Sequence, residues 1–317
     1  MGDRADSLHK DIFVMDGLSA AYLTESYVTE TLPSAGVDAL HKTVIAAGAD
    51  HTGAIEAIKE LQGNIERWEG VNQAQTVDEL TADGLSILFG FQDTTPLDDD
   101  PENVELFADL GIRVIQLTYN QQNRCGTGCT AKEDHGLTSF GTEVIDAIER
   151  HEVLLDLSHV GQKTATEALE VASAPTIFSH SNPAEVHEHP RNITDELIHA
   201  AAESGGTVGV NAYPAFVGKD PTIDDLIDHI EYLIELIGPD RVTLGLDFID
   251  NLPEEKLQVL VDDPAYPNPP YTYPEGLLSA SDIPNITSRL LDRGFSEAEV
   301  RGIMGENLLD LYNRVWS

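Results

Sequence analysis

Residues 153–180 read VLLDLSHVGQKTATEALEVASAPTIFSH, and this stretch decides the fold. It begins with one apolar run, Val153–Leu157, and ends with another, Thr176–Phe178. The segment between them, Gly161–Ala172, has a helical pattern of apolar residues. Near-continuous apolar runs of this length are typical of parallel strands that are buried on both faces. The stretch therefore predicts a strand–helix–strand unit with two neighbouring parallel strands.

The same alternation continues in both directions along the chain. Helical patterns separate eight apolar runs in all, which are Ile12–Met15, Val44–Ala47, Ile87–Gly90, Arg113–Leu117, Val153–Leu157, Thr176–Phe178, Thr207–Val210 and Val242–Leu246. Helices are expected at Thr52–Trp68, Phe140–Arg150, Gly161–Ala172, Ile193–Ser204 and Thr222–Ile237, and from Ser296 towards Tyr312, whereas Ser19–Asp38 is expected to be partly loop. Thr222 with Asp225 resembles a capping box at the start of the clearest helix.

Strand–helix alternation repeated eight times predicts an α/β fold that is a single (β/α)8 barrel of the TIM type. A doubly wound sheet is the alternative, and it is disfavoured because no strand is followed by a glycine-rich phosphate-binding turn. We expect one domain over residues 1–317. Its long irregular segment, residues 251–274, follows the last strand and is expected to lie over the C-terminal mouth of the barrel. A solvated excursion is the other interpretation of that segment.

The charge balance of the chain is strongly acidic. Lys and Arg number 18 and Asp and Glu number 56, which gives a formal net charge of −38. Such self-repulsion destabilises a compact chain at low ionic strength, whereas molar salt shortens the Debye length to about 3 Å and screens it. The composition predicts an acidic surface adapted to a salty interior, as in halophilic microbes, with an ordinary acidic protein as the alternative. Nucleic acid is excluded as a partner because the chain lacks basic patches.

The sequence shows no pattern that predicts a membrane span or export. No apolar run reaches 18 residues, so no membrane span is predicted. The stretch Met1 to Lys10 is polar and has no apolar signal core. The two cysteines, Cys125 and Cys129, do not imply a disulfide framework. A cytoplasmic location is the expectation.

Polar side chains gather where the predicted strands end, which is where barrels of this kind place their catalytic groups. In chain order these residues are Asp16, Gln92, Asp93, Tyr119, Asn120, His159, His180, Asn211 and Asp247. Two imidazoles on adjacent strands, with an Asp nearby, can hold a divalent metal that lowers the pKa of a bound water. The pattern indicates a metal-dependent hydrolase, although a lone histidine here is more often a structural residue.

Four internal motifs in order carry a resemblance to a known family. They are DLSHVG at 156–161, FSHSNP at 178–183, HPRN at 189–192 and LGLDF at 244–248, followed by GFSEAEVRGIMGENLLDLYNRVW from Gly294. From about Ile12 to Trp316 the chain resembles the renal (membrane) dipeptidase family of zinc peptidases. The resemblance implies a barrel with a metal centre that hydrolyses dipeptides, some members accepting a D-residue or opening β-lactams, and it implies a homodimer.

The resemblance assigns roles to individual residues. His159 and His180 match two histidines that hold one of the family's two zinc ions. Arg191 matches the arginine that binds the free carboxylate of the dipeptide, for which its planar fork is suited. Asp247 matches the carboxylate that handles the proton of the attacking water or the leaving amine. Tyr119 and Asn192 are the other expected substrate contacts. From the residues alone, Arg191 pairing with Asp195 is equally expected.

The chain departs from the family pattern at several positions. Leu18 and Ala20 stand where members carry the His and Asp that bind the other zinc, Gln92 stands where a Glu bridges both ions, and Tyr119 replaces a substrate-binding His. We therefore expect at most one ion, zinc or another divalent transition metal, on His159 and His180. Gln92 or Asp93 are the candidate further ligands.

Three interpretations remain open from the sequence. The first is a dipeptidase-like metallohydrolase with an altered, mononuclear site. The second is an inactive homologue that binds a small peptide or amino acid, and the third is a different amide or ester hydrolase. A side hypothesis places a rebuilt metal site on the loop of Cys125, Cys129, Glu133, Asp134 and His135, although an inert glycine-rich turn is favoured.

Overall fold

The computed structural model describes residues 2–45, 48–254, 257–258, 266 and 269–316. Eight parallel strands of this part of the chain form a nearly closed barrel, in the order β1-β2-β4-β5-β6-β7-β8-β9. Their bounds are β1 Met15–Ser19, β2 Ala39–Thr43, β4 Leu85–Phe91, β5 Ile112–Gln116, β6 Leu154–Asp156, β7 Thr176–Phe178, β8 Thr207–Val210 and β9 Val242–Leu244. The predicted (β/α)8 barrel is confirmed.

Six of the eight predicted runs overlap the strands closely, and the first two are misplaced. The strand predicted at Ile12–Met15 begins only at Met15, because Ile12 donates its backbone N–H to Leu8 O at the end of helix α1 (Gly2–Asp11). The strand predicted at Val44–Ala47 is wrong: β2 lies at Ala39–Thr43, and residues 46–47 lie outside the described residues.

A ninth strand, β3 (Val71–Ala74), was not predicted. It pairs with the first half of β4, Leu85–Leu88, while β5 pairs with the second half, Phe89–Phe91. The strand is short and only its two ends are buried, so it lacks the apolar run by which the others were found.

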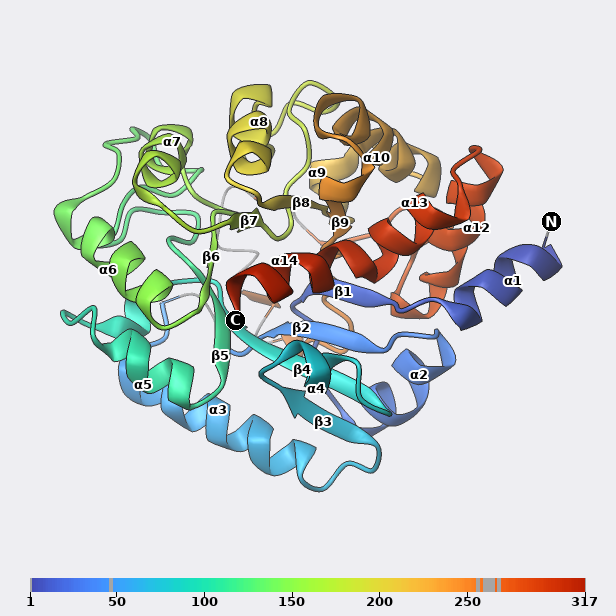
Figure 1. Ribbon diagram of the computed structural model, residues 1–317, viewed down its shortest axis with the longest axis horizontal. Helices are drawn as coiled ribbons and strands as arrows, with labels where there is room; N and C mark the ends of the chain where they lie inside the picture. The colour runs from blue at the N-terminus through green and yellow to red at the C-terminus, as the bar shows by residue number, and fades with distance from the viewer. Residues whose placement is uncertain (1, 46–47, 255–256, 259–265, 267–268, 317) are drawn as a thin grey trace.

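The helices lie in a ring around the barrel (Figure 1). After α1 their bounds are α2 Leu32–Ser34, α3 His51–Ile65, α4 Val77–Leu80, α5 Asn103–Asp109, α6 Ser139–Arg150, α7 Gln162–Val171, α8 Asp195–Glu203, α9 Pro214–Val217, α10 Ile223–Ile237, α12 Pro284–Asp292, α13 Glu297–Arg301 and α14 Asn307–Val315. At the start of α10 the Asp225 carboxylate accepts hydrogen bonds from Thr222 N and Oγ1, as the capping pattern predicted. No helix in the described ranges is long and apolar enough to cross a membrane.

The N-terminal end of the barrel is closed by the last helix. In Figure 1, α14 crosses in front of the strands. Its Leu308, Leu311 and Tyr312 are completely buried and belong to one cluster with Met15 and Ala39, which begin β1 and β2. The predicted helix from Ser296 is not continuous, because a π-helical turn at Gly302–Glu306 separates α13 from α14. The opposite, C-terminal end of the barrel is therefore the open one.

The first strand, β1, and the last strand, β9, lie next to each other, and hydrogen bonds near the open end of the barrel join their segments; we call this contact the seam. Asp247 N donates to Leu18 O at 2.9 Å, and Leu246 N donates to the Asp16 carboxylate at 2.8 Å. A Cβ on Gly17 would come within 2.4 Å of Leu244 O, so glycine is required for β1 to approach β9. The seam thus places Asp247 directly beside Leu18.

The segment 251–274 lies partly outside the described residues. Two of its described tyrosines contact residues at the strand ends. Tyr266 Oη lies 2.8 Å from Tyr119 Oη, and Tyr273 Oη donates a hydrogen bond to Asp247 O.

Candidate active site

His159 and His180 meet at the C-terminal ends of β6 and β7. Their Nε2 atoms are 2.9 Å apart, and both side chains are buried. His159 has a φ of +65°, a left-handed conformation that is uncommon for a residue with a side chain. The short turn after β6 therefore holds His159 in a strained backbone conformation that aims its ring at His180.

The other nitrogen of each imidazole is held by a polar neighbour. His159 Nδ1 lies 2.6 Å from Asn120 Oδ1, which can only accept, so this Nδ1 carries a proton. His180 Nδ1 lies 2.6 Å from Ser179 Oγ. Ser179 donates its own proton to the Asp156 carboxylate, which leaves its oxygen to accept from His180.

Both Nε2 atoms consequently present lone pairs to the same point. Two lone pairs at 2.9 Å repel unless a proton or another cation lies between them. Burial, and then the nearby positive charge of Arg191, hold the pKa of both imidazoles well below the usual value. Neutral imidazoles oriented through Nδ1 are the form in which histidine binds transition metals. The pair fits one divalent ion by its donor chemistry.

Gln92 and Asp93 follow β4, and their side chains point to different neighbours. The Gln92 amide lies against the pair, with its Nε2 3.1 Å from His180 Nε2. The Asp93 carboxylate instead accepts hydrogen bonds from Gly48 N, Thr95 and Asn123. The structure does not bring Asp93 to the histidines, because its oxygens are used by these loop residues.

Leu18 and Ala20 stand where the sequence resemblance implies the ligands of a second metal ion. Leu18 is completely buried, and Leu18 and Ala20 have no donor atom in their side chains. Within the described ranges, no group of three or more His, Cys, Asp or Glu residues is placed to hold a metal. These residues therefore do not fit a second ion beside the histidine pair.

Asp247 follows β9 with a φ of +56°, the second left-handed residue at the mouth. Its carboxylate accepts a hydrogen bond from Asn211 Nδ2 at 3.2 Å. Burial raises the pKa of Asp247 to about 6, while Arg191, Asn211 and Lys42 act to lower it. A carboxylate with such a pKa can accept and return a proton near neutral pH.

Arg191 is almost completely buried, with 2% of its surface exposed. Its Nη2 donates to His180 O at 3.0 Å and its guanidinium carbon lies 5.2 Å from the centre of the Phe216 ring. Its Nε has no hydrogen-bond partner among the described residues. The alternative pairing with Asp195 is not seen, since Asp195 accepts from Tyr232. A buried guanidinium with an unused donor is suited to an anion.

The Asn192 side chain makes its hydrogen bonds within the loops around Arg191 and not at the mouth of the barrel. Its Nδ2 donates to His187 O at 2.7 Å and to Phe216 O at 2.9 Å. These bonds hold the turn that carries Arg191 against the residue on which Arg191 stacks.

A cavity of about 320 Å³ opens at the mouth. Its polar end is lined by Gln92, Tyr119, His159, Tyr213, Asp247 and Tyr266. The Tyr119 ring stacks on His159 with centroids 4.2 Å apart. Neither His180 nor Arg191 contributes a wall atom to the cavity, although His180 contacts the wall residues Gln92 and His159. Contact between Arg191 and a ligand in this cavity therefore requires side chains to move.

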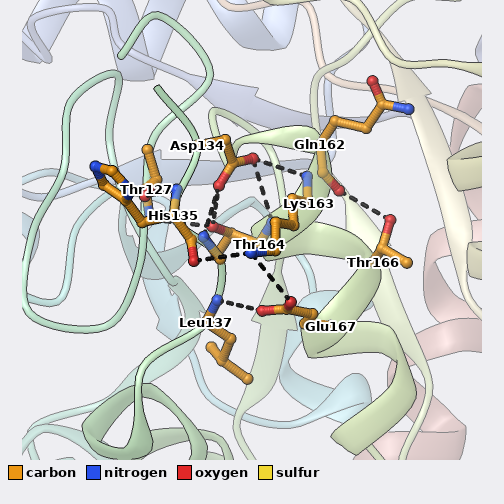
Figure 2. Close-up of polar contacts among 10 residues, drawn as sticks. Thr127, Asp134, His135, Leu137, Gln162, Lys163, Thr164, Thr166 and Glu167 are labelled. Carbon is orange, nitrogen blue, oxygen red and sulfur yellow. Dashed lines mark hydrogen bonds and ion pairs between the residues drawn. The ribbon is translucent and has the colours of Figure 1, made fainter. Parts of the chain in front are cut away.

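The loop that contains Cys125, Cys129 and Asp134 stabilises the start of helix α7. Figure 2 shows the Asp134 carboxylate facing the start of α7, where it accepts from Lys163 N, Thr164 N and Thr164 Oγ1. Gly161, at the N-cap of α7, has no side chain to do this. Cys125 is buried with its thiol 3.1 Å from Thr94 Oγ1, and neither cysteine forms a disulfide. The rebuilt metal site of the side hypothesis is not found in the described part of this loop.

Sequence reasoning missed several residues of the mouth. Ser179 and Asp156 orient His180, and their only signal was their place in the two histidine motifs. Tyr213 lies three residues after the predicted strand Thr207–Val210, where only Asn211 was singled out, and Tyr266 lies far from any predicted strand end. Lys42 lines the cavity from the end of β2, and it was missed because β2 was placed too late in the chain.

The fold and the mouth together define a (β/α)8 barrel of the hydrolase type, with paired imidazoles, a carboxylate and a buried arginine at its C-terminal end. The family model of membrane dipeptidase, peptidase family M19, matches residues 10–263. The chain belongs to this family, which is a family of metallopeptidases.

Individual relatives agree with this assignment. An uncharacterized dipeptidase of Schizosaccharomyces pombe is 32% identical over 241 residues, which cover 73% of this chain and 52% of the relative. Dipeptidase tcpJ of Claviceps purpurea is 28% identical over 284 residues, covering 88% of this chain and 62% of the relative. The chain spans about half the length of the first curated relatives that it matches.

Solved structures share the barrel over nearly the whole chain. An amidohydrolase from Pseudomonas aeruginosa superposes with a TM-score of 0.91 at 31% identity, over 98% of this chain and 99% of that chain. A metallopeptidase from Rhodobacter sphaeroides, liganded with a phosphinate mimic of the dipeptide L-Ala-D-Ala, gives a TM-score of 0.83 at 19% identity, over 96% and 99%. The second likeness shows the fold alone.

Proposed function

We propose that this protein is a dipeptidase-like hydrolase that cleaves a dipeptide or a related small amide with at most one metal ion, zinc or another divalent transition metal. The observation that carries the proposal is the 2.9 Å approach of His159 Nε2 and His180 Nε2, each with its Nδ1 held by a polar neighbour. Imidazole pairs oriented in this way are typical metal ligands. Gln92 is the neighbouring candidate for a third ligand through its Oε1, which requires the amide to turn, because its Nε2 faces His180.

The proposed chemistry divides between the ion and the side chains. When bound, such an ion supplies Lewis acidity, which makes water a nucleophile at neutral pH. Asp247 accepts the proton of that water and returns it to the leaving amine, as its raised pKa allows. Arg191 binds the free carboxylate of the dipeptide, Tyr119 contacts the substrate beside His159, and Asn192 holds the Arg191 turn in place.

The second candidate function is a binding protein without turnover. The observation that favours it is the ligand set, since the described residues supply two imidazoles and no carboxylate at the pair. Such a protein would keep Arg191 and the cavity to bind a small peptide or an amino acid.

Turnover measurements separate the two candidates. We expect a panel of dipeptides to be hydrolysed, turnover to stop after chelation and to return with Zn²⁺, and Asp247→Asn to lower kcat by about 100-fold or more. No hydrolysis of any dipeptide by metal-loaded protein, with intact binding of the same dipeptides, would establish the binding protein instead.

The proposal also includes the domain organisation of the chain and the character of its surface. We propose that residues 1–317 work as one barrel domain, with the segment 251–274 covering the mouth. The contacts of Tyr266 with Tyr119 and of Tyr273 with Asp247 support that cover. The net charge of −38 supports an acidic surface adapted to high salt.

A further inference from the structure

The cavity at the mouth is also lined by a set of apolar side chains from the β1, β2 and α3 side of the barrel. This part of the cavity, which we call the β2–α3 arm, is lined by Ala20, Leu23, Val44, Ile45, Leu61 and Leu252. It runs between the loop after β1, the end of β2 and one face of α3. The arm belongs to the same cavity as His159 and Asp247, so a ligand at the candidate site can extend into it.

The arm occupies the side of the mouth from which the second metal ion is missing. Ala20, at one of the family's ligand positions, is part of its wall, and Leu18 is buried next to Asp247. Several of the side chains that line the cavity there, such as those of Ala20, Leu23 and Ile45, have no donor atoms. A surface of this kind favours an apolar group over a charged one.

In the proposed function, Arg191 decides which end of a substrate faces the arm, once side chains have moved to open the cavity to it. Arg191 lies in the turn after β7 and stacks on Phe216, which follows β8. The arm lies at β1 and β2, and the histidines, at β6 and β7, belong to the Arg191 side. A dipeptide with its carboxylate at Arg191 therefore directs its N-terminal residue towards the arm.

We infer that the β2–α3 arm binds a large apolar side chain on the N-terminal residue of the substrate. This inference rests on the proposed dipeptidase function and names its substrate class. The residues of the arm with polar side-chain atoms are Tyr22, Lys42, Thr43, Glu60 and Asn64, of which Tyr22 and Glu60 are exposed to solvent. An acidic side chain bound at Lys42 is the competing specificity.

The test compares Gly-Gly, Leu-Gly, Phe-Gly and Glu-Gly as substrates. Burial of a Leu or Phe side chain predicts a kcat/KM about 10- to 100-fold higher for Leu-Gly and Phe-Gly than for Gly-Gly. Ala57 lines the arm from α3, and Ala57→Phe fills it. We expect Ala57→Phe to remove this advantage, so that the ratio of kcat/KM for Leu-Gly to that for Gly-Gly falls to about 1.

A matched control and a second variant keep the test decisive. Glu56, the neighbouring exposed residue of α3, does not line the cavity, so Glu56→Phe should keep the preference. If Ala57→Phe does not fold, as judged by circular dichroism, Leu61→Ala serves instead and should lower kcat/KM for Leu-Gly about 3- to 10-fold more than for Gly-Gly. Binding of reduced-amide analogues of the same peptides, measured by calorimetry, should follow the same order.

The outcomes separate this inference from the proposed function. Turnover without a preference for apolar residues, a preference for Glu-Gly, or equal losses for Gly-Gly and Leu-Gly in Ala57→Phe would each overturn the arm and leave the dipeptidase standing. If no peptide is hydrolysed, the proposed dipeptidase function is wrong. The order of the affinities measured by calorimetry then shows by itself whether the β2–α3 arm binds apolar side chains.

Discussion

The carboxyl group of Asp247 is subject to two opposing influences at the mouth. Burial raises its pKa to about 6, and the guanidinium of Arg191 is the main influence that lowers it. Asp247 can accept a proton only when it is ionised, which is above this pKa. We therefore expect kcat/KM to fall as the pH drops through about 6, as measured by a pH–rate profile, and this limb to disappear in Asp247→Asn.

Arg191→Met should move the same limb to higher pH, because the lowering influence on the Asp247 pKa is removed. A dipeptide amide is the substrate for this comparison, since it has no carboxylate for Arg191 to bind. A limb that stays at the same pH in Arg191→Met would disprove the electrostatic link between the two residues.

Arg191 is also expected to select substrates with a free carboxylate. Charge-assisted hydrogen bonds of a buried guanidinium predict that Arg191→Met raises KM for dipeptides by about 10- to 100-fold. KM for the matching amides should change by less than about threefold. Arg150→Met is the control, because Arg150 is an exposed residue paired with Glu102. Equal losses for dipeptides and amides would refute the role of Arg191.

Much of the mouth could be predicted at the level of single residues. His159, His180 and Asp247 are recognisable because they stand in compact motifs at strand ends, and Arg191 because it stands in the HPRN motif of the loop after β7. Their orienting bonds are not recognisable: Asn120 follows a predicted strand end, but its bond to His159, like the bond from Ser179 to Asp156, depends on the exact approach of neighbouring strands. Asp93 and Gln92 are adjacent in the sequence, and only the loop contacts of Asp93 decide that Gln92 faces the pair.

At the level of elements, α7 begins without a capping side chain of its own, and Asp134 supplies one from the loop before α6 (Figure 2). We expect Asp134→Ala to lower the free energy of unfolding by about 1–2 kcal/mol, measured by urea denaturation, because the first N–H groups of α7 lose their acceptor. Its metal content should equal that of the wild type.

Glu133→Ala is the matched control for this prediction, since Glu133 is exposed and lies next to Asp134. It should leave both stability and metal content unchanged. Loss of bound metal in Asp134→Ala would show that the loop is part of a metal site after all.

The strands show where sequence patterns predict elements and where they fail. The six later strands are apolar runs flanked by helices, and their positions follow from periodicity. The second strand reads ALHKT, and its His41 and Lys42 interrupt the apolar run. His41 nevertheless lies buried inside the barrel, where it bonds Gly17 O at 2.7 Å and is accommodated by Gly90. A polar residue that is satisfied only by tertiary contacts cannot be assigned to a strand interior from its neighbours in the sequence.

For the whole molecule, the net charge of −38 governs the response to salt. Raising KCl from about 0.1 M to about 1 M shortens the Debye length from about 10 Å to about 3 Å and screens the repulsion between surface carboxylates. We expect Tm to rise steeply over this range and to level off above it, as measured by calorimetry. A Tm that does not change between the two concentrations would show that the acidity is not a salt adaptation.

The number of metal ions that the protein binds distinguishes a one-ion site on His159 and His180 from the other possibilities. After loading with Zn²⁺ in high salt and desalting, mass spectrometry of the wild type should find about one ion per chain, and His180→Ala should retain almost none. His187→Ala should keep its ion, because His187 lies on the loop before Arg191 and bonds Ala215 O. A wild type that holds no ion or two ions, or a His180→Ala variant that keeps its ion, would contradict the account.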